Sequence, residues 1–183
     1  LLAIAVLNPF VREAFSADLR ERIHRLWDER ELYYDWLSRM PQVFSHFDYQ
    51  RRNLMMRTAD DGSRQVVALD WALCGHGPVG GDLGMLIGMS ANLGELEPAS
   101  LPDVGRAAED AYWEGLNAAG WQGNREWVHL TYLSWMALFA GVTAPALTAI
   151  WTNESRRDAL KRQLGVTPAE GAARWAAIAA HAL

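Results

Sequence analysis

The chain has 183 residues, half of them apolar, which is enough for one compact domain with a buried core. Its formal net charge of −5 argues against a protein that grips the phosphate backbone of a nucleic acid, because such proteins carry clustered Lys and Arg. The single cysteine, Cys74, excludes a disulfide framework and favours a reducing compartment, so we expect a cytoplasmic protein.

The chain begins with an apolar run, residues 1–7, that has no initiator Met. The run is too short to span a bilayer and has neither a basic segment nor a small-residue cleavage site. We interpret it as the continuation of a structure that begins upstream.

A helix is predicted over residues 18–40, where Leu19, Ile23 and Leu26 recur at steps of three and four. Pro41 ends it, because proline disfavours helical geometry in the residue before it.

Short apolar runs follow at residues 43–47, 53–58 and 64–71, and each suits a β-strand. Asp61 and Gly62 lie between the last two runs and form a hairpin turn signal. We therefore expect a small β-hairpin in this part of the chain.

The remainder of the sequence is predicted to be helical after a glycine-rich loop at residues 75–81. Asp82 opens the first of these helices, which extends to about residue 92, and Thr167-Pro168 followed by Glu170 is typical of a helix start. The other predicted helices cover residues 100–119, 124–151, 154–164 and 168–183. The expected fold class is α+β and mainly helical.

One of these segments resembles a membrane span, because residues 127–151 contain no Asp, Glu, Lys or Arg. His129, Thr131 and Pro145 in its interior favour the central buried helix of a globular domain instead. We therefore expect no membrane association.

Polar residues that suit phosphoryl transfer gather in one stretch. Phosphoryl transfer needs a hydroxyl held in line and magnesium ions on the phosphates, and magnesium prefers oxygen ligands. Asp48 follows His46 in a loop and is a candidate to orient an acceptor hydroxyl and take its proton. Asn53 ends the loop and Asp70 ends the apolar strand after it, and the hairpin between them folds back so that both can bind magnesium.

The stretch resembles the catalytic segment of the aminoglycoside phosphotransferase and choline kinase family, a branch of the protein-kinase-like fold. The family pattern is His-x-Asp, four residues, Asn, then an apolar strand ending in Asp and an aromatic residue, then Gly-Pro and Asp-Leu. The matching residues are His46, Asp48, Asn53, Asp70, Trp71, Gly77, Pro78, Asp82 and Leu83.

The resemblance implies that residues 1–183 form one domain, the C-terminal lobe of a kinase, with residues 41–83 as its catalytic and metal-binding segment. It implies ATP as the phosphoryl donor, Mg²⁺ as the metal, Asp48 as the catalytic residue, and Asn53 and Asp70 as metal ligands. His46 would brace the catalytic loop, and Asp82 would tie that loop to the following helix while capping the helix.

The sequence also departs from the family. Phe47 stands where many members have Gly, and the loop at residues 49–52 reads Tyr-Gln-Arg-Arg, whose arginines we expect to face solvent. Residues 1–45 contain neither a glycine-rich phosphate loop nor a strand lysine, so we expect the N-lobe to be absent and this chain alone to be inactive.

The acceptor is left open among aminoglycosides, choline, homoserine, sugars and other hydroxyl compounds, as is the oligomeric state. Tryptophans in the C-terminal helices could form a wall that binds a cation, although packing in the core is the commoner use of such residues. Acidic residues nearby could bind an aminoglycoside, although surface charges usually face only water. These residues are Trp113, Trp121, Trp127, Trp135, Trp151, Glu95, Glu97, Glu109, Asp110 and Glu114. The leading prediction is an ATP-dependent small-molecule kinase, and the alternative is a non-catalytic kinase-like binding module.

Overall fold

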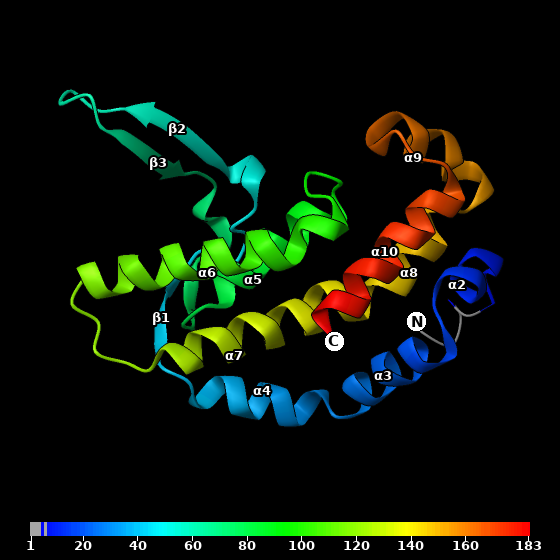
Figure 1. Cartoon of the computed structure of the whole chain (residues 1–183), viewed down its shortest axis with the longest axis horizontal. Coiled ribbons are helices and arrows are strands. Elements are labelled where there is room, and N and C mark those ends of the chain that lie inside the picture. The colour runs from blue at the N-terminus through cyan, green and yellow to red at the C-terminus, as the bar shows by residue number, and fades with distance from the viewer. Residues whose placement is uncertain (1–4, 6) are drawn as a thin grey trace.

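A computed structural model describes residue 5 and residues 7–183, and Figure 1 shows its arrangement. The fold is mainly helical α+β, with helices packed on one another and a two-stranded hairpin that projects from them. The helices are α2 (Pro9–Ala14), α3 (Ala17–Asp28), α4 (Arg30–Arg39), α5 (Gly81–Asn92), α6 (Leu101–Ala118), α7 (Arg125–Met136), α8 (Val142–Trp151), α9 (Arg157–Leu164) and α10 (Pro168–Ala182).

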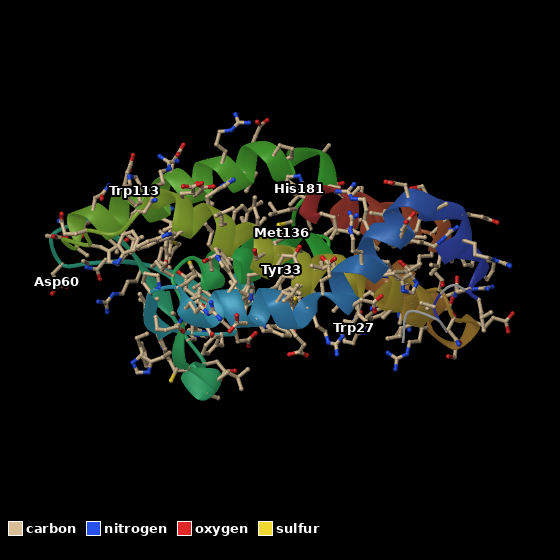
Figure 2. The ribbon with its side chains drawn as sticks, turned by 90° about the horizontal axis from the view of Figure 1, so that it is seen from below. Trp27, Tyr33, Asp60, Trp113, Met136 and His181 are labelled. Carbon is tan, nitrogen blue, oxygen red and sulfur yellow. The ribbon has the colours of Figure 1, made fainter. Side chains whose placement is uncertain are left out.

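The strands form two antiparallel pairs. In the hairpin, β2 (Leu54–Thr58) pairs with β3 (Arg64–Ala68), and its turn at residues 59–63 contains the predicted Asp-Gly signal. Figure 2 shows Asp60 at the outer end of this hairpin. In the second pair, β1 (Gln42–Ser45) lies beside β4 (Gly75–Pro78). The prediction of a loop over residues 75–81 was therefore wrong for its first half, which forms a strand because β1 supplies a partner.

The helix predicted over residues 18–40 is two helices with a break at Glu29. The carbonyl of Trp27 accepts a hydrogen bond from the Arg30 guanidinium at 2.7 Å. A continuous helix would give that carbonyl to the amide of residue 31. Here that carbonyl instead accepts from the Glu29 amide and the Arg30 side chain, whose guanidinium lies 4.5 Å from the centre of the Trp27 ring. Periodicity alone does not carry this information.

The core is built around one long helical stretch in which α7 and α8 are joined by a π-helical turn, Ala137–Gly141. Helix α5 packs closely on α7, since a Cβ at Gly84 would lie 2.9 Å from the Tyr132 carbonyl oxygen. Helix α10 packs on α8 (Figure 1). Met136 is fully buried at the centre of this arrangement (Figure 2).

The same stretch, Arg125–Trp151, is the one helix in the described part of the chain that is long and apolar enough to cross a membrane. Length and composition alone give that result, and the core helix of a soluble protein meets the same test. Here its Thr131, Met136 and Ala140 are buried against other helices.

Helix α10 begins as the sequence predicts. The Thr167 hydroxyl accepts from the Glu170 amide, and the Glu170 carboxylate accepts from the Thr167 amide at 2.7 Å, which completes a capping box. These hydrogen bonds lower the pKa of Glu170. The cap fixes where α10 starts and therefore how it lies on α8.

Candidate active site

Asp82 connects the start of α5 to the loop that carries Asp48. Its two carboxylate oxygens accept from the backbone amides of His46, at 2.7 Å, and of Phe47, at 2.9 Å. The expectation that Asp82 also caps the helix is wrong, because α5 starts at Gly81 with no side-chain cap. The carboxylate is committed to the loop, where two backbone amides would otherwise lack partners.

His46 is buried and joins the loop to the hairpin. Its Nδ1 accepts from the Asp48 amide at 3.3 Å, so the ring proton belongs on Nε2. That nitrogen then donates to the carbonyl of Leu69 at 2.8 Å. The imidazole ring therefore holds Asp48 in a set position relative to the end of β3.

Phe47, between these two residues, has a φ of 61°. This left-handed conformation strains any residue that has a Cβ, whereas glycine adopts it freely, so a glycine at this position would relieve the strain. The Phe47 ring fills the space above Gly75 and Gly77 and stacks on Trp135, with ring centres 6.1 Å apart. Packing of the ring thus offsets backbone strain in the loop.

The Asp48 carboxylate is half-buried and held by two side-chain amides. Gln50 donates to Oδ1 at 2.8 Å and Asn53 donates to Oδ2 at 2.8 Å. Asn53 also donates to the Asp48 backbone carbonyl at 2.9 Å. Both partners of the Asn53 amide are acceptors, so its nitrogen faces Asp48 and its oxygen remains for another ligand.

Asp70 lies next to Asn53 but not in the strand, which ends at Ala68. The Leu69 amide donates to the Asn53 carbonyl at 2.8 Å, so Asp70 is the residue immediately after the one opposite Asn53. Asp70 is exposed and left-handed, with φ 60°, a conformation that aspartate tolerates better than most residues. Because of this turn, Asp70 does not continue the alternation of side chains between the two faces of β3.

The predicted metal ligands are an amide oxygen and a carboxylate. Among the described residues no group of three or more His, Cys, Asp or Glu could hold a metal ion. Magnesium is commonly held by one or two protein oxygen ligands, with phosphate oxygens and water completing its octahedron. Asn53 and Asp70 fit that pattern, and their assignment stays a prediction.

Sequence reasoning missed two residues of this region. Gln50 contacts the Asp48 carboxylate directly, and no spacing rule singled it out. Arg52, expected to face solvent, is 61% exposed but pairs through Nε with the mostly buried Glu95 at 3.0 Å. Because these two residues are 43 positions apart, no local pattern could have indicated the pair.

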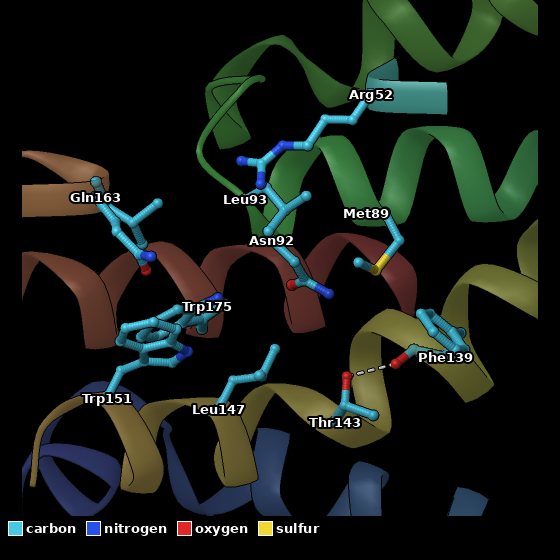
Figure 3. A pocket seen from close by; sticks show the side chains of 11 residues that line it. Arg52, Met89, Asn92, Leu93, Phe139, Thr143, Leu147, Trp151, Gln163 and Trp175 are labelled. Atoms are coloured by element: carbon cyan, nitrogen blue, oxygen red, sulfur yellow. Dashed lines mark hydrogen bonds between the residues drawn. The ribbon is translucent and has the colours of Figure 1, made fainter. Parts of the chain in front are cut away.

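A cavity of about 400 Å³ opens beside the loop and extends between α5, α8, α9 and α10 (Figure 3). Its lining residues are Arg52, Met89, Asn92, Leu93, Phe139, Thr143, Leu147, Trp151, Gln163, Leu164 and Trp175. Of the tryptophans considered above for a cation-binding wall, Trp151 lines this cavity, whereas Trp135 packs on Phe47 and Trp113 packs edge-on against Trp121.

The candidate acidic residues mostly face protein cations. Glu95 pairs with Arg52 and Glu97 with Arg174. Glu109 and Asp110 share an arginine of α7, and Glu109 also contacts His129 at 2.7 Å. Each of these carboxylates therefore already has a partner within the protein.

A family model described as the phosphotransferase enzyme family (APH) matches residues 6–127. The match covers more than half of the chain and includes the whole loop, the hairpin and α5. No curated protein and no solved structure matches the chain. Family membership implies a kinase-like fold and the use of ATP. This chain belongs to the phosphotransferase enzyme family.

Proposed function

We propose that the protein transfers the terminal phosphoryl group of ATP to a hydroxyl of a small molecule, with magnesium as cofactor, and that this chain is the catalytic C-terminal lobe. One observation carries the proposal: the Asp48 carboxylate is held in place by Gln50 and Asn53, on a loop that His46 and Asp82 brace and whose Arg52 lines a cavity of ligand size. Family membership supplies the reaction class.

Asp48 orients the acceptor hydroxyl and takes its proton as the oxygen attacks phosphorus. The amides of Gln50 and Asn53 restrict the carboxylate to one rotamer, so the acceptor meets it in a fixed direction. His46 and Asp82 act through the loop backbone and do not touch the reacting atoms. As the acceptor oxygen bonds to the terminal phosphorus, the bond from that phosphorus to the bridging oxygen breaks and ADP leaves. Asp48 keeps the proton until the products depart and then passes it to solvent.

Asn53 and Asp70 are the residues that would hold magnesium. Bound magnesium would neutralise the charge on the ATP phosphates. The Asn53 oxygen is available because its nitrogen is committed to Asp48, which links the position of the metal ligand to that of the base. Loss of Asn53 is therefore expected to disturb both functions at once.

The exposed thiol of Cys74 supports the expectation of a reducing, cytoplasmic setting. Localisation of a tagged full-length protein by cell fractionation tests this. Recovery in an oxidising compartment or in the membrane fraction would contradict it.

The proposal is tested by isothermal titration of the full-length protein with ATP, in magnesium and in EDTA. We expect ATP to bind in magnesium and to bind at least tenfold more weakly in EDTA or in Asp70→Asn. A protein that binds no nucleotide in either buffer would instead be a non-catalytic kinase-like binding module. Asp60→Asn, at the far end of the hairpin, is the matched control and should bind like the wild type.

A further inference from the structure

The cavity beside the catalytic loop has a composition that selects among acceptors. Arg52 lies in the turn Arg51–Asn53, one residue from the predicted metal ligand, and forms the rim of the cavity nearest the loop (Figure 3). Most of the remaining wall is aliphatic or aromatic. A volume of about 400 Å³ falls in the range of sites that enclose a small organic ligand.

Two buried polar groups on this wall have no partner among the described residues. Asn92 is 6% exposed and its Oδ1 accepts no hydrogen bond, while Trp175 is 1% exposed and its Nε1 donates none. Figure 3 shows both side chains on the cavity wall. Buried polar groups are rarely left unpaired because the loss of hydrogen bonds to water is costly. Both atoms are closed to solvent, so a ligand would satisfy them by pressing into the wall with one donor for Asn92 and one acceptor for Trp175.

The charge of the wall disfavours a polycationic acceptor. None of the lining residues is acidic, and Arg52 contributes a positive charge. The acidic residues nearest in sequence to the wall, Glu95 and Glu97, are paired with Arg52 and Arg174. Apart from Asp48, which the proposed function places at the reactive hydroxyl, a cation in this cavity would meet no carboxylate on the wall to offset its lost hydration. A neutral group loses little hydration there, and an anion would meet the terminal amino groups of Arg52, whose Nε is the atom bonded to Glu95.

Aromatic attraction does not reverse this preference. Trp151 and Trp175 could in principle hold a cation against their rings. The guanidinium of Arg156 already lies over the Trp151 ring, at 6.0 Å from its centre. A second cation at that ring would be repelled by the first.

From these observations we infer that the acceptor is a neutral or anionic alcohol with an apolar body about the size of an aryl-alkyl group, bearing one hydrogen-bond donor and one acceptor besides its reactive hydroxyl. The inference rests on the proposed phosphotransfer function. Most of the lining residues, from Phe139 to Trp175, lie beyond residue 127, where the family match ends. Family membership therefore does not indicate the class of acceptor, and the inference depends on the residues of this wall.

Three matched probes test the inference: N-acetylphenylalaninol, which is neutral, N-acetyl-3-phenylserine, which is anionic, and phenylalaninol, which is cationic. Binding to the full-length protein is measured by calorimetry, and ADP release is measured separately with ATP and magnesium. We expect the first two probes to bind at least tenfold more tightly than phenylalaninol. Asn92→Leu should weaken N-acetylphenylalaninol about tenfold, because the leucine cannot accept its amide proton.

A second variant, at Gln163, tests the effect of charge on binding. It should leave the core intact, because Gln163 is exposed at the rim of the cavity. Gln163→Glu should strengthen the binding of phenylalaninol and weaken the binding of N-acetyl-3-phenylserine by about threefold each, the size of an exposed ionic interaction. Gln122→Glu makes the same change on an exposed loop outside the cavity and should alter neither.

The two readouts separate failure of the inference from failure of the function. Tightest binding by phenylalaninol, or no binding by any probe, overturns the inference. ADP release with phenylalaninol alone overturns it too, while leaving the proposed phosphotransfer in place. Binding of the neutral and anionic probes, weakened by Asn92→Leu, upholds the acceptor class; if no ADP is then released, phosphotransfer is the claim that fails.

Discussion

The side-chain amide of Asn53 donates to the Asp48 carboxylate at 2.8 Å and to the Asp48 carbonyl at 2.9 Å. The predicted metal ligand and the predicted base are therefore one hydrogen-bonded unit. A change at either residue alters the position of the other, and effects of paired mutations at these residues should not add.

Asn53→Asp separates the two roles of Asn53, because it retains an oxygen for magnesium and loses the amide that holds Asp48. Two adjacent carboxylates raise the pKa of one of them. We expect kcat to fall by about 10²-fold or more and the acidic limb of the pH–rate profile to move to higher pH.

Steady-state kinetics of Asn53→Asp across pH, at saturating magnesium and ATP, measure both effects. Asn53→Ala, which removes the amide without adding a carboxylate, is the control for the pH effect. An unchanged pH profile in Asn53→Asp would contradict the coupling between the two residues.

Asp82→Ala should destabilise the fold, because it leaves the amides of His46 and Phe47 without their acceptors. We expect a loss of about 2–4 kcal/mol in the free energy of unfolding, and a smaller loss for Asp82→Asn, which keeps one acceptor. Urea unfolding followed by circular dichroism measures this.

The control for Asp82 is Asp61→Asn, at a turn where the carboxylate accepts from a single exposed amide. Its midpoint should stay near that of the wild type. Equal losses at Asp61 and Asp82 would mean that the loop does not depend on the Asp82 carboxylate.

Phe47 and Gly77 are predicted to be energetically coupled. A Cβ at Gly77 would lie 2.7 Å from the Phe47 ring, which cannot retreat freely because Trp135 stacks on it. Gly77→Ala should cost about 1–3 kcal/mol in the wild type. In a Phe47→Gly background, which removes the ring and relieves the left-handed strain, the cost should fall below about 1 kcal/mol.

A double-mutant cycle by thermal unfolding measures this coupling. Gly115→Ala, where an added Cβ meets nothing within 4 Å, is the control and should stabilise helix α6 by roughly 0.5–1 kcal/mol. Additive effects of Gly77→Ala and Phe47→Gly would refute the contact.

His181 is expected to make stability depend on pH, because partial burial lowers its pKa from 6.5. Arg22, Arg25 and Glu29 line the same groove. Above pH 6.5 both the folded and unfolded states are neutral at this residue, so it has no effect. As the pH falls below 6.5 the unfolded state binds the proton first, and the free energy of unfolding decreases until the folded-state pKa is passed.

Melting temperatures of wild type and His181→Gln between pH 7.5 and pH 5 test this assignment. The variant should lose less stability than the wild type on acidification, whereas His24→Gln, at an exposed position, should behave like the wild type. A steeper loss in His181→Gln would contradict the stated direction.

Local signals account for what could be predicted from the sequence. Thr167 and Glu170 lie within one helical turn, and the Asp61-Gly62 turn joins adjacent strands, so each was readable from neighbouring residues. The motif from His46 to Leu83 identified the family through the fixed order and spacing of its residues along the chain. Its catalytic and metal-binding roles stay predictions.

Features that depend on distant residues were not readable. Arg52 meets Glu95 only after α5 has returned the chain to the loop, and β4 is a strand because β1 lies beside it. At the break at Glu29 the Trp27 carbonyl bonds to the Arg30 guanidinium, a contact that no apolar pattern indicates. The cavity joins four helices, so its neutral polar groups at Asn92 and Trp175 had no signature in the sequence.

The most direct test of the account is magnesium-dependent ADP release by the full-length protein and by Asp48→Asn, with a panel of neutral and anionic alcohols as acceptors. We predict acceptor-dependent turnover in the wild type and a kcat about 10³-fold lower in Asp48→Asn, with ATP binding and melting temperature close to those of the wild type. Turnover in Asp48→Asn equal to that of the wild type would contradict the assignment of Asp48 as the catalytic residue.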